Sequence, residues 1–276
     1  MAHALKNSTR HPRAFGLCTA MVHASFLRIA LLCAVFLCVA LLCVAFLCSC
    51  GQGESTSSAS SSSVVVASYD ERLDGLMVDG KKVRNETKRA LSNQHVPYAS
   101  KVQTEYQLPE LPSGCEVVSL TIALRAAGFE LSKTEIADNY LVVDGSEWGF
   151  LASPYEDNGG GFPPGIVDAA NSYLAEQDTL LKAHDLTGSS FEALCALVDT
   201  GIPVCVWTTL EFNEPNYDYE LGATESWFVN EHCVVLYGIQ GSEVLISNPL
   251  EGLQTVDTAQ FAHAYEQCGT MALAVY

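Results

Sequence analysis

The stretch "LPSGCEVVSLTIALRAAG", Leu111–Gly128, is apolar on nearly every face of a helix. A helix that is apolar all round is typical of the centre of a domain, because none of its faces suits water. Ser113 and Glu116 stand three residues apart and match a capping box, which would turn the Glu116 carboxylate back to the backbone. Gly128 suits the cap that ends such a helix. We therefore predict a buried central helix with Cys115 in its first turn.

The rest of the chain reads as helices first and strands afterwards. Two more capping boxes, Ser132–Glu135 and Ser189–Glu192, and Pro164 in a first turn predict three further helices. After Gly201 the pattern changes to β-rich runs, and Gln240-Gly241-Ser242 is a hairpin signal. The predicted strands are 203–210, 231–239, 244–248 and 271–276, with a short helix over 258–267. This order predicts an α+β fold with an antiparallel sheet.

The first fifty residues read as a targeting segment. Basic residues precede the apolar run Ile29–Leu47, which is the pattern of a secretory signal. "LCSC", Leu47–Cys50, resembles a lipoprotein signal box and predicts cleavage before Cys50 and lipidation of Cys50. The same apolar run could instead remain as an uncleaved helical anchor, because about 20 apolar residues span a bilayer. Both interpretations place the folded part outside the cytoplasm at the cell membrane.

The remaining chain divides by composition. Residues 51–68 are Ser-rich and predict a flexible linker, because such a tract cannot bury a core. Residues 69–95 hold most of the remaining basic residues and are interpreted as a connecting segment. Residues 96–276 are long enough for one well-buried domain. We therefore predict one folded domain that is tethered to a membrane.

The charge of the chain excludes one class of partner. The first fifty residues hold four of the 14 Lys and Arg residues and none of the 32 acids, so the remainder carries a formal charge of −22. Nucleic acids and anionic lipid surfaces bind basic patches. The sequence therefore argues against nucleic acid and against anionic lipid headgroups as ligands.

Beyond Cys50 there are five cysteines, an odd number in a protein on the oxidising side of a membrane, which indicates a free thiol. If Cys115 is that thiol, the others could form two disulfides in three possible pairings or simply pack in the core: Cys195, Cys205, Cys233 and Cys268. No Cys or His spacing matches a zinc site, so we predict neither a metal nor a cofactor.

Cys115 has candidate partners elsewhere in the chain. Free N–H groups and the positive dipole end at a helix start favour a thiolate. If the hairpin turn centres on Gln240, His232 faces Asn248, whose amide oxygen would accept the Nδ1–H of the ring. That arrangement is a Cys-His-Asn triad. The Cys115 N–H and the side-chain amide of Gln107 are the candidate donors to an oxyanion.

These residues carry a family resemblance. "YQLPELPSGCEVVSLTIALRAAGFELSKTEIADNYL", "PVCVWTTL", "EHCVVLYGI" and "VLISNPLEG" occur in this order and resemble the peptidase C39-like family, papain-fold relatives of the double-glycine bacteriocin-processing peptidases. The likeness covers about residues 96–255. It implies a papain-like fold and thiol peptidase chemistry. It also implies Cys115 as nucleophile, His232 as base, Asn248 as the orienting residue and Gln107 as oxyanion donor; many such sequences have Asp at the position of Asn248.

The predicted function is a membrane-tethered, extracytoplasmic thiol hydrolase that cleaves peptide bonds. Its substrate would be a protein, a secreted peptide or the peptide stems of a cell wall. Two alternatives remain open on the same fold. One is a surface lipoprotein that binds without catalysis, and the other is a thiol acyl or peptidyl transferase.

Overall fold

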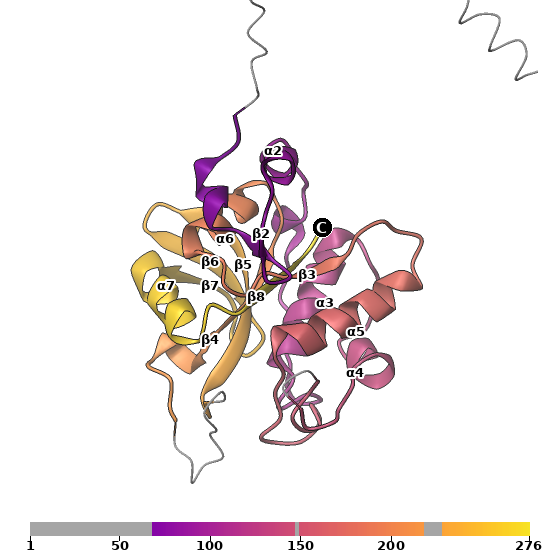
Figure 1. The fold of residues 1–276 in the computed structure, drawn as a ribbon. Coiled ribbons are helices and arrows are strands. Elements are labelled where there is room, and N and C mark those ends of the chain that lie inside the picture. The colour runs from indigo at the N-terminus through magenta and orange to yellow at the C-terminus, as the bar shows by residue number, and fades with distance from the viewer. Residues whose placement is uncertain (1–67, 147–148, 218–227) are drawn as a thin grey trace, which may run out of the picture. The chain divides into compact units, whose positions relative to one another are not determined.

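The computed structural model describes residues 68–146, 149–217 and 228–276 (Figure 1). The predicted signal, the Cys50 acceptor and nearly all of the predicted linker lie outside these residues. None of the helices in the described ranges combines the length and apolarity that a bilayer span requires.

The predicted central helix is α3, Cys115–Ala127. Eleven of its 13 residues are buried, and it contacts strands β4 and β5, which confirms the prediction of an interior helix. Gly128 ends it in a left-handed conformation with φ of 107°. Helices α4, Glu135–Asn139, and α5, Pro163–Ala175, pack beside it (Figure 1).

A six-stranded antiparallel sheet forms the other half of the fold, in the order β3-β8-β4-β5-β6-β7. The strands are β3 Ala183–Asp185, β4 Val204–Thr209, β5 Glu231–Gln240, β6 Glu243–Asn248, β7 Gly252–Asp257 and β8 Ala272–Val275. Strands β4, β5, β6 and β8 lie where the sequence predicts them. The two edge strands were not predicted, because β3 has three residues and β7 buries only Gly252 and Val256.

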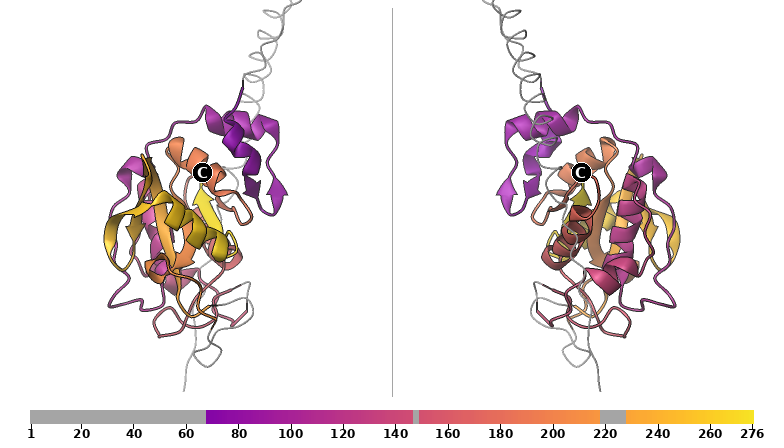
Figure 2. Two further views of the ribbon diagram at one scale, coloured as in Figure 1. Left: turned by 90° about the vertical axis from the view of Figure 1, so that its left-hand side faces the viewer. Right: turned by 90° about the vertical axis from the view of Figure 1, so that its right-hand side faces the viewer.

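The central strands are buried on both faces. Cys205, Trp207, Cys233 and Val235 face α3 and α5, whereas the alternate residues Val204, Val206, Val234 and Leu236 face a second core. That second core is closed by α6, Phe191–Asp199, and α7, Thr258–Gln267. Figure 2 shows the helices on either side of the sheet. The α+β class is confirmed.

Residues 69–95 form regular elements. They comprise the 3-10 helix η1, Glu71–Gly75, the short strands β1, Met77–Val78, and β2, Lys81–Lys82, and helix α2, Asn85–Ser92. Buried leucines of this segment, Leu73, Leu76 and Leu91, share the core of α6. Two further 3-10 helices are η2, Ala99–Lys101, and η3, Leu210–Phe212.

The three predicted capping boxes are not formed. Gly114 is the N-cap of α3 and Thr134 that of α4, and neither helix has a side-chain cap. At α6 the cap is Ser190, whose hydroxyl accepts from the Ala193 N–H at 3.3 Å. Ser189 is unavailable because it is buried and its hydroxyl accepts from the Met77 N–H. Each helix therefore starts one or two residues later than its capping box indicates.

The five cysteines of the described residues are all free thiols. Cys205, Cys233 and Cys268 are buried and Cys195 is partly exposed on α6. The sequence left two alternatives for the four cysteines other than Cys115, disulfide pairing or packing as free thiols. In the structure they pack as free thiols.

Candidate active site

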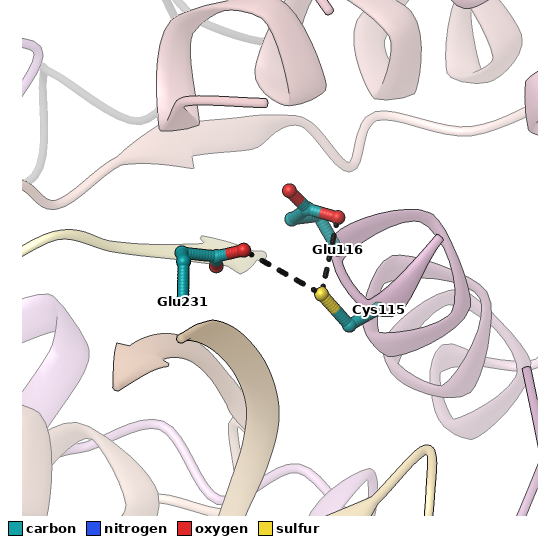
Figure 3. A group of neighbouring side chains, drawn as sticks. All are labelled: Cys115, Glu116 and Glu231. Atoms are coloured by element: carbon teal, nitrogen blue, oxygen red, sulfur yellow. Dashed lines mark hydrogen bonds between the residues drawn. The ribbon is translucent and has the colours of Figure 1, made fainter. Parts of the chain in front are cut away.

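Cys115 is the first residue of α3, and its sulfur lies between two carboxyl groups (Figure 3). The Sγ atom is 3.3 Å from Glu116 Oε2 and 3.7 Å from Glu231 Oε2. Glu116 does not turn back to Ser113 as a capping box requires. Its Oε1 accepts from the backbone N–H of Gly161 at 2.6 Å, because the fully buried side chain points across the core instead of to the helix start.

These carboxyl groups change the expected charge of the thiol. Burial, followed by the charges of Glu116 and Glu231, holds the pKa of Cys115 well above its ordinary value. A helix start alone would favour the thiolate. Burial and the two carboxyl groups outweigh that partial charge, so the resting thiol is neutral. Burial also raises the pKa of Glu116 to about 7, and burial and Glu116 raise that of Glu231 well above its ordinary value.

His232 and Asn248 meet as the sequence predicts. His232 Nε2 lies 2.8 Å from Asn248 Oδ1, and both residues are buried. The Leu250 N–H also donates to Asn248 Oδ1, at 2.9 Å, which fixes the amide with its oxygen toward the ring. The ring therefore carries its proton on Nε2, and Nδ1 is the free acceptor. Burial lowers the pKa of His232, against the opposing effect of the Asn248 hydrogen bond, so the ring is a neutral base.

The predicted strand register and ring nitrogen were both wrong in detail. The turn lies at Gly241-Ser242, and a bulge between Leu236 and Gly238 shifts the ladder so that Val235 pairs with Ser247. On this register Asn248 comes level with Val234, two residues from His232 on the same face. The amide thus reaches the ring diagonally and accepts from Nε2, not from Nδ1. A long side chain spans this diagonal distance, so the pairing survives the shift.

Gln107 lies beside the same site. Its side chain is buried, with Nε2 donating to the Pro112 carbonyl at 2.8 Å and Oε1 enclosed without a partner. Its backbone N–H donates to the Pro249 carbonyl at 2.9 Å, which joins the segment before α3 to the turn after β6. An amide nitrogen has two protons, so Nε2 keeps one for a further acceptor.

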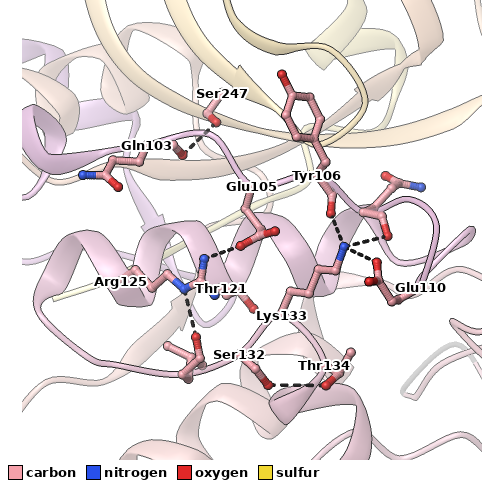
Figure 4. Close-up of polar contacts among 12 residues, drawn as sticks. Gln103, Glu105, Tyr106, Glu110, Thr121, Arg125, Ser132, Lys133, Thr134 and Ser247 are labelled. Atoms are coloured by element: carbon pink, nitrogen blue, oxygen red, sulfur yellow. Dashed lines mark hydrogen bonds and ion pairs between the residues drawn. The ribbon is translucent and has the colours of Figure 1, made fainter.

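Charged side chains hold the segment that carries Gln107 (Figure 4). Lys133 Nζ donates to the Tyr106 carbonyl at 2.6 Å and pairs with Glu110. Arg125 of α3 pairs with Glu105. The Ser247 hydroxyl donates to the Gln103 carbonyl at 3.3 Å and ties the segment to β6. These contacts fix the segment against both the helix and the sheet.

One cavity of about 300 Å³ connects these groups. Gln107, Cys115, Glu231 and His232 all line it, as do apolar side chains such as Leu210, and no Lys or Arg is among the described residues that do. In the described part of the chain, the sulfur contacts the two carboxyl groups and makes no hydrogen bond to His232. A nucleophile, a neutral base and amide donors around one cavity can carry out acyl transfer.

Sequence reasoning missed the role of the two glutamates. Glu116 was assigned to helix capping, and Glu231 was read only as the start of a strand. The sequence does contain a signal for both residues, because each glutamate is directly adjacent to a candidate catalytic residue. Glu116 follows Cys115, and Glu231 precedes His232. The Cys115 sulfur and one carboxyl oxygen each of Glu116 and Glu231 lie within 4.8 Å of one another. The thiol and the two carboxyl groups form one hydrogen-bonded cluster in this structure.

Comparisons with known proteins show the family of this chain. The model of the Peptidase_C39 like family matches residues 93–273. The uncharacterized protein YvpB of Bacillus subtilis (strain 168) is 27% identical over 202 residues, which cover 68% of this chain and 79% of that protein. A crystal structure named as a C39-like peptidase from Bacillus anthracis is 32% identical, with a TM-score of 0.55, over 64% of this chain and 95% of that chain. The peptidase domain of Streptococcus ComA is more distant, at 15% identity and a TM-score of 0.40 over 63% of this chain and 96% of that chain. The match over residues 93–273 and the α+β fold show that this chain belongs to the Peptidase_C39 like family.

Proposed function

We propose that this chain is a cysteine peptidase in which Cys115 is the nucleophile, His232 the base and Asn248 the residue that orients the base. The observation that carries the proposal is the His232–Asn248 hydrogen bond of 2.8 Å, which leaves Nδ1 free beside a cavity that Cys115 also lines. The C39-like peptidase structure from Bacillus anthracis supports the same chemistry.

The chemistry needs one movement of the thiol. Hydrogen bonds between catalytic groups are often long in an empty site and tighten when substrate binds. Rotation about the Cα–Cβ bond of Cys115 is the torsion that moves its sulfur from Glu116 toward His232, which is the neighbour of Glu231 on β5. The S–H proton then passes to Nδ1 as the sulfur bonds to the carbonyl carbon of the substrate.

The remaining steps return every group to its starting state. The backbone N–H of Cys115 has no partner within the helix and can donate to the oxyanion, together with the second proton of Gln107 Nε2. The imidazolium gives its proton to the leaving amine as the C–N bond breaks and a thioester remains. Water, deprotonated by His232, then hydrolyses the thioester and restores the thiol.

Asn248→Ala is expected to lower kcat/KM by about ten- to a hundredfold, because a hydrogen bond to the ring that becomes charged is lost. Asn248→Asp is the matched control, since a carboxylate can accept from both Nε2 and the Leu250 N–H, and it should keep most of the activity. The measurement is cleavage of a fluorogenic peptide, with the thermal unfolding midpoint recorded for each variant. Unchanged cleavage by a folded Asn248→Ala variant would rule out the orienting role.

The proposed location is the outer face of the cell membrane, held by a lipid on Cys50. The support is the basic residues, the apolar run and the "LCSC" box that precede a Ser-rich tract. Cys50→Ser is expected to abolish the mass increase of a diacylglyceryl group on the mature protein and to leave an uncleaved precursor. Fractionation with intact-mass spectrometry checks this, and two chains that differ only by the mass of the Cys-to-Ser substitution would contradict lipidation.

A further inference from the structure

The two carboxyl groups beside the sulfur differ in how they are held. Glu116 is anchored on Oε1 by the Gly161 N–H, and Gly161 is itself fixed because its carbonyl accepts from the buried Trp207 indole at 2.9 Å. Glu231 begins β5, and its Oε1 is enclosed without a hydrogen-bond partner among the residues that the structure describes. A backbone N–H stabilises a carboxylate, so Glu116 is the better place for a negative charge and Glu231 the better place for a proton.

The number of protons in the cluster also favours a proton on Glu231. The thiol has one proton and can donate to one carboxyl oxygen at a time, and Glu116 Oε2 is the nearer, at 3.3 Å. The contact of 3.7 Å between the sulfur and Glu231 Oε2 then needs a proton on Glu231. With that proton in place, the Glu231 carboxyl would donate to sulfur while sulfur donates to Glu116. Figure 3 shows both carboxyl groups directed at the sulfur.

Among the described residues that line the cavity there is no Lys or Arg. The titratable groups that interact with the sulfur or with Glu231 are Glu116 from α3, Cys233 from β5 and Cys268 after α7, and His232 and Asp157 line the same cavity. His232 is neutral because of its burial. Two adjacent buried carboxyl groups without a cation cannot both ionise readily, so the pair keeps a proton near neutral pH.

We propose that Glu231 is a further catalytic side chain of this site, which donates a hydrogen bond from its carboxylic acid to the Cys115 sulfur and stabilises the thiolate that attacks the substrate. The S–H proton still goes to His232, and the Glu231 proton stays on its carboxyl throughout. The inference rests on the proposed function, because it assumes that Cys115 is the nucleophile.

A direct consequence is a loss of thiol reactivity at alkaline pH. The pKa of Glu231 is raised by its burial and by Glu116, so the acid form is present below that raised pKa and is lost as the pH increases through it. Glu116 ionises first, at about 7, and Glu231 therefore follows at a higher pH. Above that point a second carboxylate repels the thiolate and no longer donates to it.

The test is the rate of iodoacetamide alkylation of Cys115 in the full chain with EDTA present, resolved by peptide mapping, in parallel with peptide cleavage. Glu231→Gln retains an N–H donor that does not ionise, so it should match the wild type at about pH 6.5 and lose the decline above about pH 7. Glu231→Leu removes the donor and should lower the rate at about pH 6.5 by about tenfold or more. Glu243→Gln, the same substitution at an exposed residue beside the β5–β6 turn and outside the cavity lining, should leave the wild-type profile unchanged.

Two results would overturn the role of Glu231. One is a decline above about pH 7 that persists unchanged in Glu231→Gln, and the other is a Glu231→Leu variant that reacts like the wild type at about pH 6.5. A purely structural role would change the unfolding midpoint without changing the pH profile, so the midpoint is measured for every variant. Absence of peptide cleavage by the wild type would contradict the proposed function instead, and the alkylation profiles would still decide the role of Glu231.

Discussion

Cys115→Ala is expected to abolish peptide cleavage, with kcat/KM lower by about four orders of magnitude or more. The alanine cannot form the thioester, and no other described thiol lines the cavity that His232 borders. The fold should survive, because Cys115 has a small side chain in the first position of α3 and its replacement leaves a void of about one sulfur atom. A peptide library analysed by mass spectrometry gives the cleavage sites and the rate.

Cys195→Ala is the matched control for this experiment. Cys195 is also a free thiol, but it lies on α6 on the other side of the sheet, and its removal should leave cleavage unchanged. Cleavage that persists in Cys115→Ala would contradict the thiol mechanism. Products in which the acyl part is joined to a second amine would identify a transferase, and a wild type that cleaves nothing would favour the binding lipoprotein.

His232→Gln is expected to lower cleavage by about three orders of magnitude or more and to change how Cys115 responds to pH. Glutamine is polar and of similar size but cannot take the thiol proton. The thiol should then ionise alone, against the burial and the carboxyl groups that raise its pKa. Alkylation of Cys115 in this variant should rise about tenfold per pH unit throughout the accessible range, and peptide mapping across pH measures it.

His263→Gln serves as the control for the histidine variant. His263 is exposed on α7 and pairs with Glu214 at 2.9 Å, away from the Cys115 cavity. It should keep both the cleavage rate and the pH profile of the wild type. If His232→Gln kept the wild-type profile, another group would have to be the base.

The sequence predicts those elements of the fold that have a regular hydrophobic pattern. The apolar residues of 117–127 predict an interior helix, and the β-rich runs around Gly241 predict a hairpin; both are present. The His232–Asn248 pair was also predicted, although from the wrong register. The turn lies later in the chain than predicted, but the bulge in β5 shifts the register by one residue and brings Asn248 level with Val234, on the face of His232.

The parts that were missed depend on distant residues. Ser113 and Glu116 have the spacing of a capping box, but the Gly161 N–H, 45 positions later in the chain, provides a buried partner for Glu116. Glu231 contacts Cys115 only because β5 and the start of α3 meet in space. Local spacing contains neither fact. Burial of the thiol, together with these two contacts, reverses the prediction that the helix start favours a thiolate at Cys115.

The most direct test of the account is the pH dependence of iodoacetamide alkylation of Cys115 in the wild-type full chain, resolved from the other thiols by peptide mapping. The Cys115–His232 pair can transfer its proton internally, and the pKa of His232 lies below its ordinary value because the ring is buried. The rate should therefore level off at or below neutral pH and should not rise with hydroxide. A rate that increases about tenfold per pH unit up to about pH 8.5, as for an isolated thiol, would contradict the account.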